Sequence, residues 1–138
     1  MTYSVRTLDG APFRIGPGEQ ATLVAVFATW CASCRTEFVS LDSLQRALAP
    51  RGVRVLALSV DEGDDARVRR YAAARRTQVQ VAHDGTGTVG RSFGLVGVPE
   101  SFLVDGAGVV RWHRQGELRT GLTGLAEAVQ SLGGGGIR

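Results

Sequence analysis

The chain has 138 residues, of which 43% are hydrophobic and 21% charged, so it is long enough for one globular domain with a sizeable core. Its net charge is +3 and every basic residue is an arginine; because these arginines are not interleaved with aromatic residues, nucleic-acid binding is not expected. No apolar run approaches the roughly 18 residues of a membrane span, and the N-terminal sequence MTYSVRTLDG lacks the pattern of a signal peptide. We therefore expect a soluble chain, either cytoplasmic or separated from an export signal or membrane anchor.

The N-terminal part of the chain is predicted to form a β-hairpin followed by a buried strand. Residues 3–7 and 12–15 are short strand patterns, and the turn signal Leu8-Asp9-Gly10 lies between them. Residues 22–28 read TLVAVFA, a mostly apolar and partly β-branched run that is typical of a strand buried on both faces. This strand leads the chain to its two cysteines.

Cys31 and Cys34 stand at the junction between this strand and a helical pattern. From Ala32 onward apolar residues recur about every 3.6 positions, so a helix is predicted to begin there and to end near Ala49. A helix N-terminus has unpaired N–H groups and a partial positive charge, which lower the pKa of a thiol placed there. We therefore predict that Cys31 is the exposed nucleophile and that Cys34 resolves the mixed disulfide that Cys31 forms with a substrate.

Other roles for the two cysteines stay open at this point. A zinc site would need about four ligands, and only His83 and His113 could join the cysteines. A purely structural disulfide across so short a loop would constrain the unfolded chain little. A redox-active pair is favoured, because CxxC between a buried strand and a helix is typical of that chemistry.

Two neighbours of the cysteines are candidate site residues. Trp30 is interpreted as a partly buried core aromatic, as a flat apolar wall beside the thiol, or as both. Glu37 follows Cys34 by about one helical turn. It is either an ordinary surface glutamate or a partly buried acid that manages the proton of Cys34 during exchange.

The central part of the chain alternates strands and helices. Residues 53–60 read VRVLALSV, a buried parallel strand; a charged helix is expected over about 64–75 and a short strand over 78–82. The acids that follow the first of these strands are Asp61, Glu62, Asp64 and Asp65. Because they lead directly into an arginine-rich helix, we interpret them as a solvated helix face, with a docking surface for a partner as the alternative.

The C-terminal part begins with a short helix predicted over 88–93. Residues 94–105 follow and read GLVGVPESFLVD, in which a proline precedes an apolar strand. The next strand is predicted over 109–113, with His113 structural or exposed. A last amphipathic helix is expected to reach Leu132, before a disordered glycine-rich tail over 133–138.

The sequence FATWCASCRTE, residues 27–37, together with its upstream strand resembles the active site of thioredoxin-like oxidoreductases, and more specifically that of their extracytoplasmic TlpA/ResA/DsbE branch. Residues 94–105 resemble the fingerprint of the DsbE-type proteins of cytochrome c maturation, with Leu95 and Ser101 as mild departures. The N-terminal hairpin and the helix–strand segment 61–82 also resemble this branch.

The resemblance covers nearly the whole chain and implies a thioredoxin-like α/β fold. A central mixed β-sheet flanked by helices is expected, with an N-terminal β-hairpin and a central helix–strand insertion, in a single domain over 1–132. Ala25 stands where many thioredoxins carry a buried aspartate, so that proton path is missing. The dipeptide Ala32-Ser33 is neither the Gly-Pro of thioredoxin nor the Pro-His of strong oxidants.

The resemblance also implies roles for the residues around Pro99. The Val98–Pro99 bond is expected to be cis, with Pro99 packed against the disulfide. Val98 would offer its backbone N–H and C=O groups to an extended substrate. Glu100 would add negative charge beside the site and oppose thiolate formation; alternatively, it is a surface acid at a strand edge.

The activity implied is thiol–disulfide oxidoreduction through Cys31 and Cys34, without a metal or an organic cofactor. Implied partners are disulfide-bonded proteins such as apocytochrome c or its thiol carrier, and a membrane thiol transporter as electron donor, outside the cytoplasm. One alternative is a copper-binding assembly protein that uses both cysteines and a distant histidine. Another is a peroxidase of the peroxiredoxin type, which would carry Thr or Ser three residues before a single peroxidatic cysteine, where this chain has Ala28.

Overall fold

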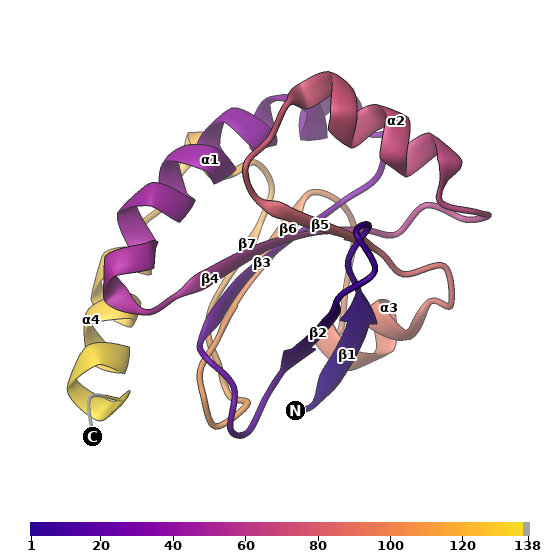
Figure 1. Ribbon diagram of the computed structural model, residues 1–138. Coiled ribbons are helices and arrows are strands. Elements are labelled where there is room, and N and C mark those ends of the chain that lie inside the picture. The colour runs from indigo at the N-terminus through magenta and orange to yellow at the C-terminus, as the bar shows by residue number, and fades with distance from the viewer. Residues whose placement is uncertain (137–138) are drawn as a thin grey trace.

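The computed structural model describes residues 1–136, in which a five-stranded mixed sheet is covered on both faces (Figure 1). Its strands are β3 (Thr22–Phe27), β4 (Arg54–Ser59), β5 (Gln80–His83), β6 (Glu100–Val104) and β7 (Val110–Gln115). Their order in space is β5-β4-β3-β6-β7; β3, β4 and β5 are parallel, whereas β6 is antiparallel to β3 and β7 to β6. The predicted N-terminal hairpin is present as β1 (Tyr3–Arg6) and β2 (Pro12–Ile15).

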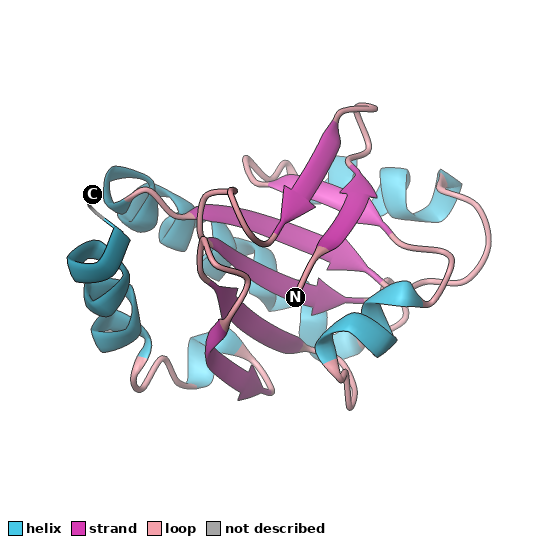
Figure 2. Ribbon diagram, turned by 90° about the horizontal axis from the view of Figure 1, so that it is seen from below, coloured by secondary structure: helices cyan, strands magenta, loops and turns pink. Residues whose placement is uncertain are grey.

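Helices and the hairpin form the outer layers of an α/β sandwich. Within residues 1–136 the α-helices are α1 (Glu37–Leu48), α2 (Ala66–Arg75), α3 (Thr88–Phe93) and α4 (Leu125–Gly136). The helices α1 and α2 cover one face of the sheet (Figure 1), and the hairpin and α3 cover the other face (Figure 2). Among the described residues, no helix has the length and the apolar character that crossing a membrane requires.

The central strand β3 separates two hydrophobic cores. All of its side chains are buried, because successive residues point to opposite faces and both faces are covered. Leu23 and Phe27 lie in the core that includes residues of α1, α2 and α4. Val24 and Val26 lie in the core that includes residues of the hairpin and α3. The sequence pattern of a strand buried on both faces is therefore confirmed.

The segment that contains the cysteines differs from the predicted helix. Residues Ala32–Thr36 form a tight 3₁₀ turn, η1, and α1 begins at Glu37 rather than at Ala32. The N–H of Cys34 donates to the carbonyl oxygen of Cys31 at 3.2 Å, which is the three-residue spacing of such a turn. Apolar periodicity does not distinguish this turn from the first turn of an α-helix. Cys31 and Cys34 form a disulfide across η1.

The last helix continues beyond the end expected from the sequence. Its apolar side includes the buried residues Leu125 and Val129, and α4 runs to Gly136. The tail predicted as disordered, 133–138, therefore begins inside this helix. Residues 137–138 lie outside the described residues, so for them the prediction stays untested.

Candidate active site

The disulfide lies just beyond the carboxyl end of β3. This strand ends at Phe27, and the N–H of Cys31 donates to the carbonyl oxygen of Ala28 at 3.1 Å. Cys31 is 7% exposed and Cys34 is 0% exposed. The prediction of an exposed Cys31 is therefore wrong for the disulfide form, because both cysteines belong to the hydrophobic core cluster on this side of the sheet. Cys31 is still the more accessible of the two residues.

Two residues close to Cys31 in the sequence, Ser33 and Trp30, bear on its chemistry. The hydroxyl oxygen of Ser33 lies 3.5 Å from the Cys31 sulfur, within reach of a hydrogen bond to a thiolate. Trp30 is 68% exposed, so its interpretation as a core aromatic is wrong. A flat apolar surface next to the disulfide agrees with the other interpretation of Trp30, and its contact with substrate stays a prediction.

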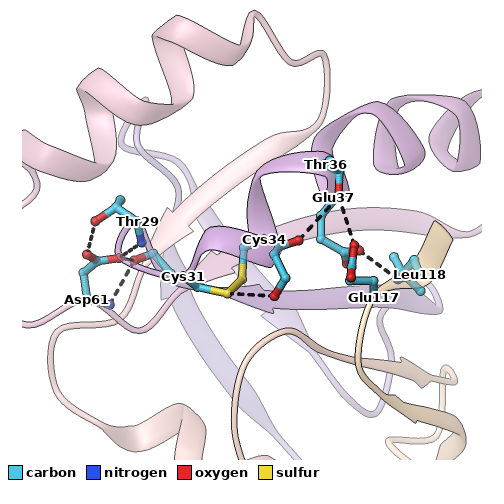
Figure 3. Close-up of a disulfide and its surroundings, with 10 residues drawn as sticks. Thr29, Cys31, Cys34, Thr36, Glu37, Asp61, Glu117 and Leu118 are labelled. Carbon is cyan, nitrogen blue, oxygen red and sulfur yellow. Dashed lines mark hydrogen bonds between the residues drawn. A yellow bond between two sulfur atoms is a disulfide. The ribbon is translucent and has the colours of Figure 1, made fainter. Parts of the chain in front are cut away.

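Glu37 is buried at the start of α1 and is 2% exposed, so its interpretation as a surface glutamate is wrong. Its Oε1 accepts the N–H of Leu118 at 2.7 Å (Figure 3). Its Oε2 is buried and has no hydrogen-bond partner in the described part of the chain. Burial raises the pKa of Glu37 to about 7, although the Leu118 N–H opposes this shift. A carboxyl group with this pKa can take up or release a proton near neutral pH.

The turn η3 (Leu118–Thr120) lies beside Glu37, since its first residue donates an N–H to the Glu37 carboxyl group. Glu117 accepts a hydrogen bond from the Thr36 hydroxyl at 3.2 Å (Figure 3) and another from Arg119 at 2.8 Å. The negative charge of Glu117 adds to the rise in the pKa of Glu37, whereas the charges of Arg114 and Arg119 lower it. Charged groups of this segment and of Arg114 thus influence the pKa of Glu37 in both directions.

Asp61 was not predicted to belong to the site, yet it anchors the segment that precedes Cys31. It is 2% exposed. Its carboxylate accepts hydrogen bonds from the N–H of Thr29 at 2.9 Å and from the Thr29 hydroxyl at 2.5 Å (Figure 3). It also accepts one from the Ser59 hydroxyl at 2.6 Å. Although burial acts to raise it, hydrogen bonds from Ser59 and Thr29 hold the pKa of Asp61 below its ordinary value.

The interpretation of the acids as one solvated helix face is therefore wrong for Asp61. Glu62, Asp64 and Asp65 are exposed as expected. Asp61 differs because it lies two residues after the carboxyl end of the buried parallel strand β4, close to the end of the neighbouring strand β3. That position in the sequence is the signal that could have identified it.

The segment around Pro99 lies at the same end of the sheet as the disulfide. In the register of β6 with β3, Glu100 pairs with Val26, so Pro99 is adjacent to the end of β3. The Val98–Pro99 bond is cis, as expected. Val98 packs against the core cluster that contains Cys31 and Cys34. Contact of Val98 and Pro99 with a substrate stays a prediction.

Glu100 is 1% exposed, so its interpretation as a surface acid at a strand edge is wrong. Its Oε1 accepts the N–H groups of Val96 at 2.8 Å and Gly97 at 3.0 Å. Its Oε2 lies 2.5 Å from Nε2 of His113. The structure thus gives Glu100 a role in holding the preceding loop, and its effect on thiolate formation stays a prediction.

Both histidines that were considered as metal ligands have other partners. His83 is within 2.6 Å of Asp65 and of the carbonyl oxygen of Asp61 through its two ring nitrogens, and His113 contacts Glu100. Within residues 1–136, no group of three or more His, Cys, Asp and Glu residues has the arrangement of a metal site.

The fold and the cysteine pair define a thioredoxin-like protein. The chain belongs to the AhpC/TSA family, whose sequence model matches residues 5–113. It is 34% identical over 113 residues to the thiol:disulfide interchange protein DsbE of Yersinia pestis, a match that covers 82% of this chain and 56% of that protein. It is 31% identical over 96 residues to DsbE of Escherichia coli K12, with coverages of 70% and 50%. The chain thus spans about half the length of these curated relatives.

Solved structures agree on the fold. A DsbE-type protein from Chlorobium tepidum superposes with a TM-score of 0.81 at 22% identity, over 96% of this chain and 94% of that chain. StoA from Bacillus subtilis gives a TM-score of 0.75 at 19% identity, with coverages of 85% and 89%. The predictions of a thioredoxin-like fold and of relatives in the TlpA/ResA/DsbE branch are confirmed.

Proposed function

We propose that the protein is a thiol–disulfide oxidoreductase that reduces substrate disulfides. The observation that carries this proposal is the disulfide between Cys31 and Cys34, in which Cys31 is the more accessible partner, at the end of the central strand. In the reduced protein, the Cys31 thiolate attacks a substrate disulfide and forms a mixed disulfide, while the other substrate sulfur leaves as a thiolate. The Cys34 thiolate then attacks the Cys31 sulfur and releases the second substrate thiolate. Two electrons pass to the substrate, and its two thiolates take up protons.

In this mechanism, Glu37 takes up the proton of Cys34. The second step needs a thiolate at Cys34, although this residue is fully buried and burial disfavours a charged sulfur. Glu37 lies in the turn after Cys34 (Figure 3), and its Oε2 has no hydrogen-bond partner among the described residues. Its pKa of about 7 suits a group that accepts a proton from a thiol and later returns it.

For the substrate, we propose apocytochrome c cysteines or a thiol carrier that holds them, outside the cytoplasm, with a membrane thiol transporter as the electron donor. Support comes from the resemblance of residues 94–105 to the DsbE-type fingerprint and from the relatives named DsbE. This proposal requires that the substrate binds as an extended peptide beside Val98 and the exposed ring of Trp30.

The first test is to trap the mixed disulfide. A Cys34→Ser variant should accumulate a covalent adduct with an oxidised peptide through Cys31, and Cys31→Ser should form none. Equilibration of the wild type with a dithiol buffer then gives its reduction potential. A value near −270 mV, roughly that of thioredoxin, supports a reductant, whereas a value near −120 mV, roughly that of a strong oxidant, contradicts it.

A second candidate, a peroxidase, is favoured by one observation, the match to the AhpC/TSA family over residues 5–113. Ala28 stands three residues before Cys31, where the peroxidase pattern has Thr or Ser. We therefore expect no consumption of hydrogen peroxide by the reduced protein beyond that of Cys31→Ser. Rapid turnover of peroxide by the wild type alone would favour the peroxidase instead.

A further inference from the structure

The loop formed by residues 95–99, hereafter the 95–99 loop, has an exposed middle that a single carboxylate holds, whereas backbone hydrogen bonds with Gly90 and Gly116 hold its two ends. Val96 is 75% exposed and Gly97 is also exposed. The N–H groups of these two residues both donate to Oε1 of Glu100, at 2.8 and 3.0 Å. Any displacement of this carboxylate therefore releases two consecutive amides directly before Val98.

His113 contacts the carboxylate oxygen of Glu100 that the loop amides do not use. The Glu100 side chain is 1% exposed, and its Oε2 lies 2.5 Å from Nε2 of His113. The His113 ring is itself fixed, because it stacks on Phe102 with 4.6 Å between ring centroids and 12° between ring planes. Phe102 and His113 also pair directly in the register of β6 with β7. A buried carboxylate without its donors is strongly disfavoured, so this contact is expected to be strong.

We propose that His113 is a positioning residue for the 95–99 loop. By donating from Nε2 to Oε2 of Glu100, it fixes the carboxylate whose Oε1 holds the loop amides. The loop then presents the side chain of Val96 and the backbone of Val98 in one geometry to an extended disulfide substrate. The part that concerns substrate rests on the proposed function, whereas the anchoring of the loop does not.

Two substitutions separate the hydrogen bond from the ring contact. His113→Phe retains a ring that can stack on Phe102 and removes the donor. His113→Gln retains a donor and removes the ring. If His113 acts through Glu100, only the first substitution should release the loop; if it acts by packing alone, only the second should. Thermal midpoints establish that both variants are folded, and His113→Leu replaces His113→Phe if the latter does not fold.

Amide hydrogen exchange of Val96 and Gly97, measured by NMR on the oxidised full chain, reports the anchor without any enzymatic assay. We expect both amides to exchange about tenfold faster in His113→Phe, as the loss of one charge-assisted hydrogen bond implies. His113→Gln should exchange at nearly the wild-type rate. Unchanged exchange in His113→Phe, or equal acceleration in both variants, would overturn the proposal.

Kinetics with two substrates then test the consequence for binding. For reduction of a disulfide-bridged peptide, KM should rise about tenfold in His113→Phe with little change in kcat. The KM of His113→Gln should stay close to the wild-type value. Reaction with the small reagent 5,5′-dithiobis(2-nitrobenzoate), which needs no contact with the loop, should not change. If amide exchange is faster in His113→Phe but its KM for the peptide is unchanged, the role of the 95–99 loop in substrate binding is overturned. A wild type that reduces no peptide refutes the proposed function while the exchange result still decides the anchor.

Discussion

The oxidised wild type is expected to lose stability as the pH rises, and replacement of Glu37 by Gln should abolish this pH dependence. Burial raises the pKa of Glu37 from 4.5 to about 7, so the folded chain binds this proton more tightly than the unfolded chain. The stabilisation from the protonated group is complete below the unfolded pKa. It decreases as the pH rises and is lost once the pH passes the folded pKa.

The size of this effect follows from the two pKa values. At roughly 1.4 kcal/mol for each pKa unit, ionised Glu37 costs the folded chain about 3 kcal/mol. Glu37→Gln has no such dependence, but its Nε2 would occupy the position of Oε2, which has no hydrogen-bond partner in the described residues. That unsatisfied amide costs about 1–3 kcal/mol at every pH. The variant should therefore be less stable than the wild type at pH 5 and equally or more stable at pH 8.

The assay is urea unfolding of the disulfide form at four pH values from 5 to 8, since the oxidised cysteines do not titrate. The matched control is Glu62→Gln, which neutralises an exposed glutamate and should follow the wild-type curve. A difference in unfolding free energy between wild type and Glu37→Gln that stays constant from pH 5 to pH 8 would refute the reasoning, because Glu37 would then not titrate in this range.

Three further substitutions test other parts of the structure. Asp61→Ala should lower the unfolding free energy by about 3 kcal/mol in urea titrations, because it leaves buried donors without an acceptor. Trp30→Ala should raise KM for a peptide disulfide several-fold, with a thermal midpoint close to wild type because the ring is 68% exposed. Gly108→Ala should lower the thermal midpoint by several degrees, since its Cβ would lie 2.4 Å from the Met1 carbonyl oxygen; Gly10→Ala, which has a similar φ and nothing within 4 Å, should lower it less.

Local patterns were sufficient to predict most strands and helices of the fold, although not the 3₁₀ turn at the cysteines or the end of α4. The run TLVAVF forms β3 with every residue buried, because β-branched and apolar residues without alternation indicate two covered faces. The helix predicted over 88–93 coincides with α3, since Gly94 ends it in the left-handed conformation that favours glycine. Elements that depend on residues adjacent in the sequence can therefore be derived from the sequence alone.

The burial of the site acids could not be derived in this way, because their partners are remote in the sequence. Glu37 binds the N–H of Leu118, 81 residues away, and Asp61 binds Thr29, 32 residues away. Asp61 also has acidic neighbours that are exposed, so composition favoured a solvated position. Only the tertiary arrangement brings each carboxylate to the backbone N–H that offsets the cost of its burial.

Buried carboxylates at this end of the sheet bear on the direction of electron flow. Glu37, Asp61 and Glu100 each accept backbone N–H groups from a different segment around the disulfide. Asp61 keeps its charge, since hydrogen bonds hold its pKa below the ordinary value. We predict that the charge of Asp61 disfavours a thiolate at the nearby cysteines, which would stabilise the disulfide relative to the dithiol and make the dithiol the better reductant. Glu37 moderates this effect, because with a pKa of about 7 it can be protonated when the Cys34 thiolate forms. We therefore expect these acids to favour the reduction of substrates over their oxidation, as the proposed function requires.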